Sequence, residues 1–243
     1  LYQIKSHDWG SIIRYHIEKD KLVLADEKVK YPKGCINFGL AHGIIAPLIA
    51  LAKAKKYGYN VKGINATISG LRQLYEKYSI RDMNILKYPT MLSVEDYFSN
   101  TVSKDSITYN AGWCYGNAGI VRGLMKVSYY LNDNNNYQYY KKELLSIINQ
   151  ELDNYNFDLP IVCHGYASVL SIQISAFRES GDKSFLITRE RNMRQTIISH
   201  RNCIFNDEYT NDYSILSGES GTILTLINGI YLGKEYPKLL MID

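Results

Sequence analysis

Apolar and polar residues follow each other along most of this chain with the period of an α-helix. Three stretches carry one apolar and one polar face, at residues 71–78, 139–152 and 184–198. Four others are apolar almost all round, at residues 44–54, 120–131, 169–177 and 222–232. Because helices that are apolar on all sides are buried and amphipathic helices cover them, we predict an all-α fold of helical hairpins in two layers.

A glycine stands at the opening of each apolar stretch. These glycines, Gly43, Gly116, Gly165 and Gly218, are 73, 49 and 53 residues apart. Such spacing is typical of helical repeat proteins, and we place one insertion between repeats at residues 80–108. Glycine is expected to let the backbone turn sharply before the helix. If the hairpins pack side by side, the residues before each glycine meet on one face.

No segment looks like a linker between domains. Residues 131–140 carry an Asn/Asp cluster, which predicts a loop between helices that is too short to separate two domains. We therefore predict a single helical-repeat domain over residues 1–243.

Composition excludes several classes of protein. The chain has 243 residues, 46% of them hydrophobic and 21% charged, as in ordinary globular proteins. The net charge is +4 and no Lys/Arg block is dense enough for nucleic-acid binding. No apolar stretch is long enough to cross a membrane. The first residues lack a signal-peptide pattern, so we expect a cytoplasmic protein with reduced thiols. They also lack a Met, so we expect a processed chain or a piece of a longer one.

Residues with metal and acid–base chemistry stand just before the glycines. They are His42, the pair Cys114–Tyr115, the pair Cys163–His164, and Ser217. Two cysteines and one histidine form a known catalytic zinc set that leaves the fourth position open. We therefore predict one Zn²⁺ bound by Cys114, Cys163 and His164. His42 is the candidate general acid or base beside it, and Tyr115 could add its hydroxyl to the site.

Structural explanations exist for the same residues. A cysteine can be a small buried apolar residue, and a histidine at a helix start can simply be hydrogen-bonded. Cys35 and Cys203 lie outside the repeat positions and are expected to be buried filler. His7, His16 and His200 are expected at the surface. A metal-free helical repeat protein, with the three ligands as packing residues, stays a possible interpretation.

Four motifs together resemble the lanthionine synthetase C family, the cyclases of lantibiotic biosynthesis. They are GLAHGI (39–44), GWCYGNAGI (112–120), VCHGY (162–166) and SGESGTILTL (217–226), and the resemblance runs from about Tyr31. It implies an α/α toroid with inner and outer helix rings. It also implies one zinc on Cys114, Cys163 and His164, with His42 as the acid or base.

The resemblance also implies a reaction and partners. The substrate would be a dehydrated precursor peptide with its leader, whose Cys thiols add to dehydroalanine or dehydrobutyrine to form (methyl)lanthionine rings. A dehydratase and an exporter would be partners, and any membrane association would come through them. The alternative is a non-catalytic zinc-containing scaffold that binds a peptide or thiol.

Two departures from the family pattern favour that alternative. Asn110 stands where related cyclases often carry Arg. The chain is also shorter than the family, so the resemblance makes it the C-terminal part, a partial ring. An open part-ring is expected to expose apolar faces.

Overall fold

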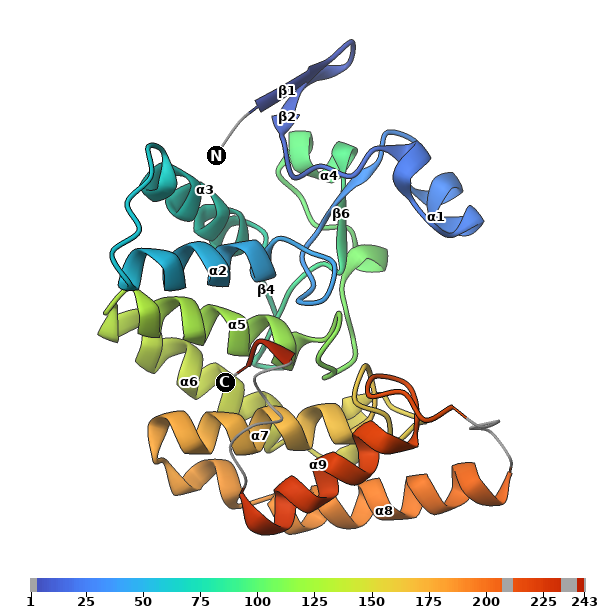
Figure 1. Ribbon diagram of the computed structural model, residues 1–243. Helices are drawn as coiled ribbons and strands as arrows, with labels where there is room; N and C mark the ends of the chain where they lie inside the picture. Colours follow the sequence, from blue (N-terminus) through green and yellow to red (C-terminus); the bar gives the residue numbers. More distant parts are fainter. Residues whose placement is uncertain (1–3, 207–211, 233–239, 243) are drawn as a thin grey trace.

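A computed structural model describes residues 4–206, 212–232 and 240–242 of the chain. Its main body is a stack of helices in two layers (Figure 1). Helices α2, α5, α7 and α9 pack against one another in that order, and α3, α6 and α8 pack on α2, α5 and α7 respectively. Their bounds are α2 Ile45–Lys56, α3 Ile64–Lys77, α5 Asn117–Tyr130, α6 Asn134–Ile148, α7 Tyr166–Ser180, α8 Arg189–Phe205 and α9 Glu219–Tyr231. The prediction of stacked two-layer hairpins is confirmed.

Burial follows from the apolar pattern in the middle of the stack. Helix α5 is buried along almost its whole length, and α7 is buried from Tyr166 to Ala176. Helix α6 instead buries one face, which includes Leu144 and Ile147. Pro47 lies in the first turn of α2, where a missing N–H costs no helical hydrogen bond.

Lack of space for a side chain explains the four repeat glycines. A Cβ atom on Gly43, Gly116, Gly165 or Gly218 would lie only 2.0–2.3 Å from a backbone atom of its own loop. None of the four has a positive φ, so glycine is needed here for space and not for a left-handed backbone conformation. The loop folds so closely on itself that any side chain would force it open.

A backbone ladder links successive repeats through the residues two positions before each glycine. The Cys163 N–H donates to the Leu216 carbonyl at 2.9 Å. The Cys114 N–H donates to the Cys163 carbonyl at 3.0 Å, and the Ala41 N–H donates to the Cys114 carbonyl at 3.4 Å. We call this row the repeat ladder. It confirms that the four loops occupy equivalent positions and lie side by side.

The fold also contains short strands, so the all-α prediction was incomplete. Three two-stranded antiparallel sheets occur in the described residues: β1 Ile4–His7 with β2 Gly10–Ile13, β3 Cys35–Asn37 with β6 Met91–Ser93, and β4 Ile80–Asp82 with β5 Ile85–Lys87. Short helices accompany them: α1 Ala25–Lys30, α4 Val94–Ser99, and 3-10 turns at Lys19–Lys21, Lys104–Ser106, Leu152–Tyr155 and Lys183–Leu186. The expected insertion at 80–108 holds β4, β5, β6 and α4.

Two further expectations need correction. The predicted loop at 131–140 is mostly helix, because α6 begins at Asn134 after Asp133, whose side chain accepts a hydrogen bond from the Asn136 N–H. His16 is buried rather than at the surface, and its Nε2 lies 2.7 Å from the Lys33 carbonyl. His7 and His200 are partly exposed, and Cys35 and Cys203 are buried as expected.

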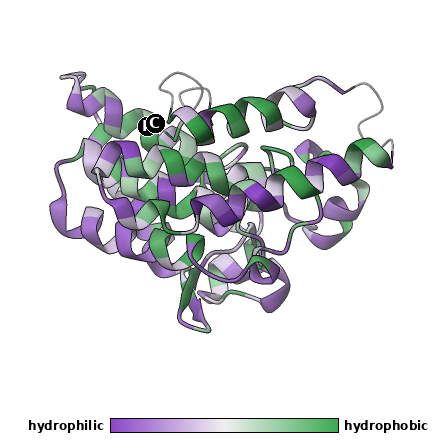
Figure 2. Cartoon of the chain, turned by 90° about the horizontal axis from the view of Figure 1, so that it is seen from below, coloured by the Kyte–Doolittle hydropathy of each residue, from purple (hydrophilic) through white to green (hydrophobic). Residues whose placement is uncertain are grey.

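Helix α9 differs from the other apolar helices because its apolar side is exposed. It buries Gly221, Thr222, Thr225, Asn228 and Gly229. Its exposed face, here the α9 face, consists of Ile223, Leu224, Ile227 and Ile230, which are 40–60% exposed. Hydrophobic residues are visible along this region in Figure 2. The prediction of a buried helix over 222–232 is therefore wrong, whereas the expected exposure of apolar faces is confirmed.

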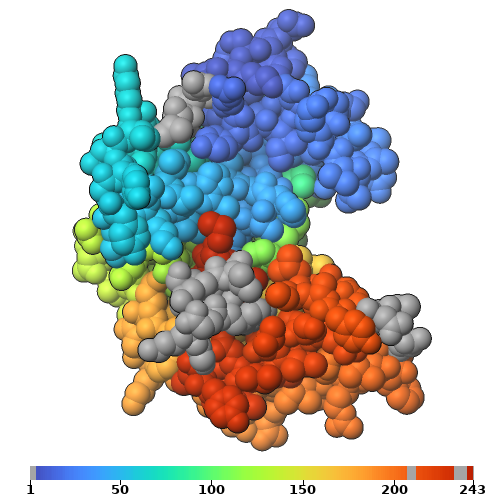
Figure 3. All heavy atoms as spheres, in the orientation of Figure 1, coloured from blue at the N-terminus to red at the C-terminus, as the bar shows by residue number. Residues whose placement is uncertain are grey.

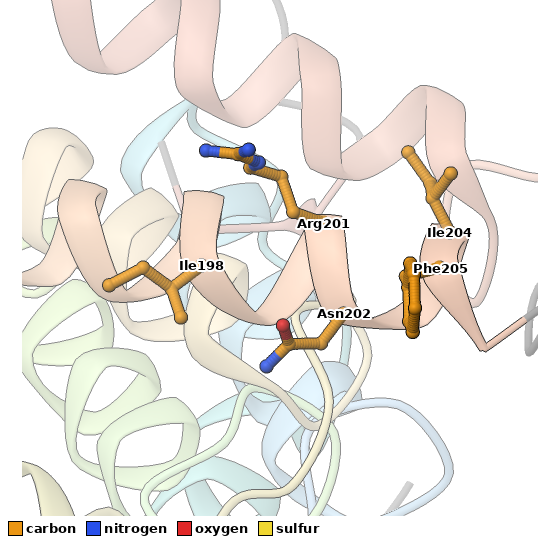
Figure 4. A pocket seen from close by; sticks show the side chains of 5 residues that line it. All are labelled: Ile198, Arg201, Asn202, Ile204 and Phe205. Carbon is orange, nitrogen blue, oxygen red and sulfur yellow. The ribbon is translucent and has the colours of Figure 1, made fainter.

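Helix α8 continues the exposed apolar surface. A shallow hollow of about 460 Å³ lies on it, lined by Ile198, Arg201, Asn202, Ile204 and Phe205 (Figure 4). None of the residues singled out for chemistry lines this hollow. Among the described residues, no helix is both long and apolar enough to cross a membrane.

Candidate active site

The repeat loops bring the chemistry-bearing residues together in two rows. The first row is the repeat ladder, which places Cys114 and Cys163 next to each other through a backbone hydrogen bond. The second row holds the residues directly before each glycine, which are His42, Tyr115, His164 and Ser217. Seen as spheres, the molecule is indented on the side where the inner helices begin (Figure 3).

The two thiols and one imidazole form a chain of contacts. The Cys163 thiol shares a side-chain hydrogen bond with the Cys114 thiol and another with His164. The hydrogen bond from Cys114 is the main cause that lowers the pKa of Cys163, with His164 adding to it. The same bond raises the pKa of Cys114, which keeps its proton. Of the two thiols, Cys163 is therefore the one that loses its proton more easily. The hydrogen bond with Cys163, and after it the charge of Cys163, raises the pKa of His164, which burial opposes.

Exposure divides the five predicted site residues. Cys114 is buried and Cys163 and Tyr115 are half-buried, whereas His164 and His42 are exposed. A ligand from solvent therefore meets the imidazoles and the Cys163 sulfur before it meets Cys114.

His42 and Tyr115 form a second pair beside the thiols. Their rings are stacked, with centroids 5.8 Å apart and planes inclined by 27°. Burial raises the pKa of Tyr115 to about 12, the neighbouring Cys114 adds to the rise, and a hydrogen bond with Asn37 opposes it. Tyr115 is thus a neutral phenol at physiological pH. His42 also lies close enough to Cys163 to favour its thiolate.

Asn37 is a site residue that the motif analysis missed. Besides bonding Tyr115, its Oδ1 accepts a hydrogen bond from the Gly39 N–H at 2.9 Å. Asn110 makes the equivalent bond to the Gly112 N–H at 3.0 Å in the next repeat. The shared Asn-x-Gly spacing, six residues before the repeat glycine, is the signal that could have revealed both. Asn110 therefore shapes the loop that carries Cys114.

The side chains of the three candidate ligands are of the types that bind zinc in proteins. Thiolate sulfur and imidazole nitrogen are the ligands that zinc prefers, and Cys163 contacts both Cys114 and His164. Across residues 4–206, 212–232 and 240–242, no three His, Cys, Asp or Glu side chains are already arranged as a metal-binding cluster. The three candidates thus touch in sequence, Cys114 to Cys163 to His164, rather than surrounding one point.

Fold and site define a two-layered helical-repeat protein with a thiol–imidazole cluster at the openings of its inner helices. Residues 5–241 match the lanthionine synthetase C-like proteins, so the chain belongs to that family. It is 27% identical over 165 residues to the nisin biosynthesis protein NisC of Lactococcus lactis subsp. lactis. The matched residues make up 67% of this chain and 38% of that protein.

A solved structure agrees in fold. The chain is similar to nisin cyclase with a TM-score of 0.81 and 23% sequence identity, over 95% of this chain and 56% of that chain. The chain therefore spans less than two thirds of the length of either relative. The family resemblance drawn from the four motifs is confirmed, whereas the zinc and the roles of the five site residues stay predictions.

Proposed function

We propose that this chain carries the cyclase centre of a zinc-dependent lanthionine synthetase. Its substrate is a dehydrated precursor peptide, and the product is a (methyl)lanthionine thioether ring. The observation that carries the proposal is the contact of Cys163 with both Cys114 and His164, beside His42. In a member of the lanthionine synthetase C-like family, that cluster offers a metal ligand set and an acid–base group in one place.

Zinc would be held by Cys114, Cys163 and His164. When bound, it supplies a Lewis acid that keeps a peptide Cys thiol as a thiolate at neutral pH. The low pKa of Cys163 favours binding, because a cysteine ligand must first lose its proton.

The reaction itself is a conjugate addition. The peptide thiolate forms a C–S bond to the β-carbon of the dehydro residue, and the electron pair of the double bond moves toward the α-carbon and its carbonyl. His42 donates the proton that the α-carbon takes up. Tyr115, stacked on His42, holds that ring in place and offers a neutral hydroxyl to the peptide. Holding thiol and alkene together supplies much of the rate.

We also propose that the helical hairpins form an arc of an α/α toroid. The repeat ladder supports this, because each loop donates a backbone hydrogen bond to the equivalent loop of the next repeat. The α9 face supports it too, since an apolar helix face of this size needs a cover. The similar nisin cyclase structure is longer than this chain, and further hairpins of the same kind would cover the α9 face.

The test is ring formation with a dehydrated Cys-containing peptide and zinc. Because cyclisation leaves the peptide mass unchanged, it is followed by the loss of thiols that can be alkylated. His42→Ala is expected to keep the metal and to lose at least about 100-fold in rate, the usual contribution of a general acid. His200→Ala, a partly exposed histidine on α8, is the matched control and should react normally.

Two outcomes would count against the proposal. Normal ring formation by His42→Ala would remove His42 from the mechanism. A zinc-loaded chain that binds the peptide but consumes no thiol would favour the non-catalytic scaffold.

A further inference from the structure

A segment far along the sequence is packed behind the Cys114 loop. Leu240 and Ile242 are 1% and 0% exposed and belong to the main hydrophobic core. The indole N–H of Trp113 donates to the Leu240 carbonyl at 2.8 Å, across 127 residues of sequence. The residue next to a candidate zinc ligand is thus fixed by residues 240–242.

The same segment joins the two helices behind the thiols. The Ile242 carbonyl accepts a hydrogen bond from Arg122 Nε at 3.0 Å, and it also accepts one from the Ser175 hydroxyl. Arg122 is on α5, which follows the Cys114 loop, and Ser175 is on α7, which follows the Cys163–His164 loop. One carbonyl therefore bridges the helices that support all three candidate ligands.

Trp113 is held from two directions. Its carbonyl lies so close to α5 that a Cβ on Gly119 would come within 2.0 Å of it. Its side chain is held by Leu240 on the other side. Because Cys114 is the next residue and is tied to Cys163 by the repeat ladder, a shift of Trp113 changes the separation of the two sulfurs.

We propose that residues 240–242 position the Cys114–Cys163 thiol pair, acting through the Trp113 indole hydrogen bond. The inference rests on the proposed function insofar as that pair binds metal. Trp113 is a positioning residue, since its indole bonds the Leu240 carbonyl and it would act on the metal only through Cys114. Groups that orient metal ligands without binding the metal typically change metal affinity by about 10- to 100-fold when altered.

The test uses the full chain with Co²⁺ as a spectroscopic stand-in for zinc. Trp113→Phe removes the N–H donor and keeps an aromatic ring in the core. We expect about a tenfold weaker Co²⁺ affinity and a shifted visible absorption spectrum, which reports ligand geometry. Tyr78→Phe is the matched control, because it removes another buried aromatic donor to a backbone carbonyl, that of Tyr97 at 2.8 Å, away from the thiols.

The results of this test either support or overturn the positioning role of residues 240–242. A Trp113→Phe protein with the affinity and spectrum of the wild type would overturn the inference alone. A wild type that binds no Co²⁺ would overturn the metal site and this inference together. Should Trp113→Phe fail to fold, Ser175→Ala removes one of the donors to the Ile242 carbonyl. Its visible absorption spectrum is then expected to shift relative to that of the wild type, and an unchanged spectrum contradicts the proposal.

Discussion

A buried ion cluster links α5 and α7, the two helices that follow the loops with the candidate ligands. Glu179 on α7 accepts hydrogen bonds from Arg122 at 2.8 and 3.1 Å and from Lys126 at 2.6 Å, both on α5. The Arg122 side chain is 0% exposed, Lys126 5% and Glu179 8%. Burial alone would raise the pKa of Glu179, but the charges of Arg122 and Lys126 and their hydrogen bonds outweigh it and lower that pKa to about 2.

The shift has a calculable effect on stability. A carboxyl whose pKa falls from 4.5 to about 2 on folding stabilises the folded state by about 3 kcal/mol at neutral pH. Because the folded pKa is the lower one, this contribution is complete above about pH 5. It is lost as the pH falls through the folded pKa, and about 2 kcal/mol should be gone by pH 3.

The assay is urea unfolding of the wild type and Glu179→Gln at pH 7 and pH 3. At pH 7 the variant is expected to lose about 3–5 kcal/mol, because two buried cations lose their counter-charge. At pH 3 the difference should shrink by about 2 kcal/mol. Glu190→Gln, which breaks an exposed pair with Arg194, should cost at most about 0.5 kcal/mol. An equal loss for Glu179→Gln at both pH values would refute the ionised pairing.

Two further predictions concern the thiols and the exposed apolar surface. In the metal-free chain at pH 6, iodoacetamide should alkylate Cys163 well before Cys35. The reason is that the hydrogen bond with Cys114 lowers the pKa of Cys163, whereas burial raises the pKa of Cys35 to about 12. Equal alkylation rates of the two cysteines, measured by mass spectrometry, would contradict this. Ile227→Ser on the α9 face should reduce self-association in sedimentation velocity. Ile187→Ser, which changes an exposed residue in the turn before α8, should not. Equal effects of the two variants would leave the α9 face without a special role.

The helical layers were predictable because their signals are long and repeated. The four glycines and the apolar stretches after them predicted the inner helices. The repeat ladder shows that the glycine spacing places the loops next to one another. The strands are only three or four residues long, too short for an alternating pattern to stand out. The predicted start of α6 was too late in the sequence, because Asn134 and its neighbours suggest a loop, although Asp133 before them is an N-cap.

The convergence of the candidate residues was predictable from the sequence, but the contacts that support their loops were not. Cys114, Cys163 and His164 stand at repeated positions, so the sequence alone indicated that they meet. Nothing local in the sequence connects Trp113 to Leu240, because their contact depends on how distant segments pack. The exposed side of α9 was also missed, since a periodic pattern tells which face is apolar and not whether a partner covers it.

The proposed function requires that the repeat loops converge on a zinc site. The most direct test is the metal content of the purified chain after reconstitution with zinc, for the wild type, Cys163→Ala and Cys203→Ala. Cys203 is a buried cysteine on α8 and serves as the matched control. We predict about one zinc in the wild type and in Cys203→Ala and its loss in Cys163→Ala. A chain that takes up no zinc, or a Cys163→Ala protein that keeps it, would contradict the claim.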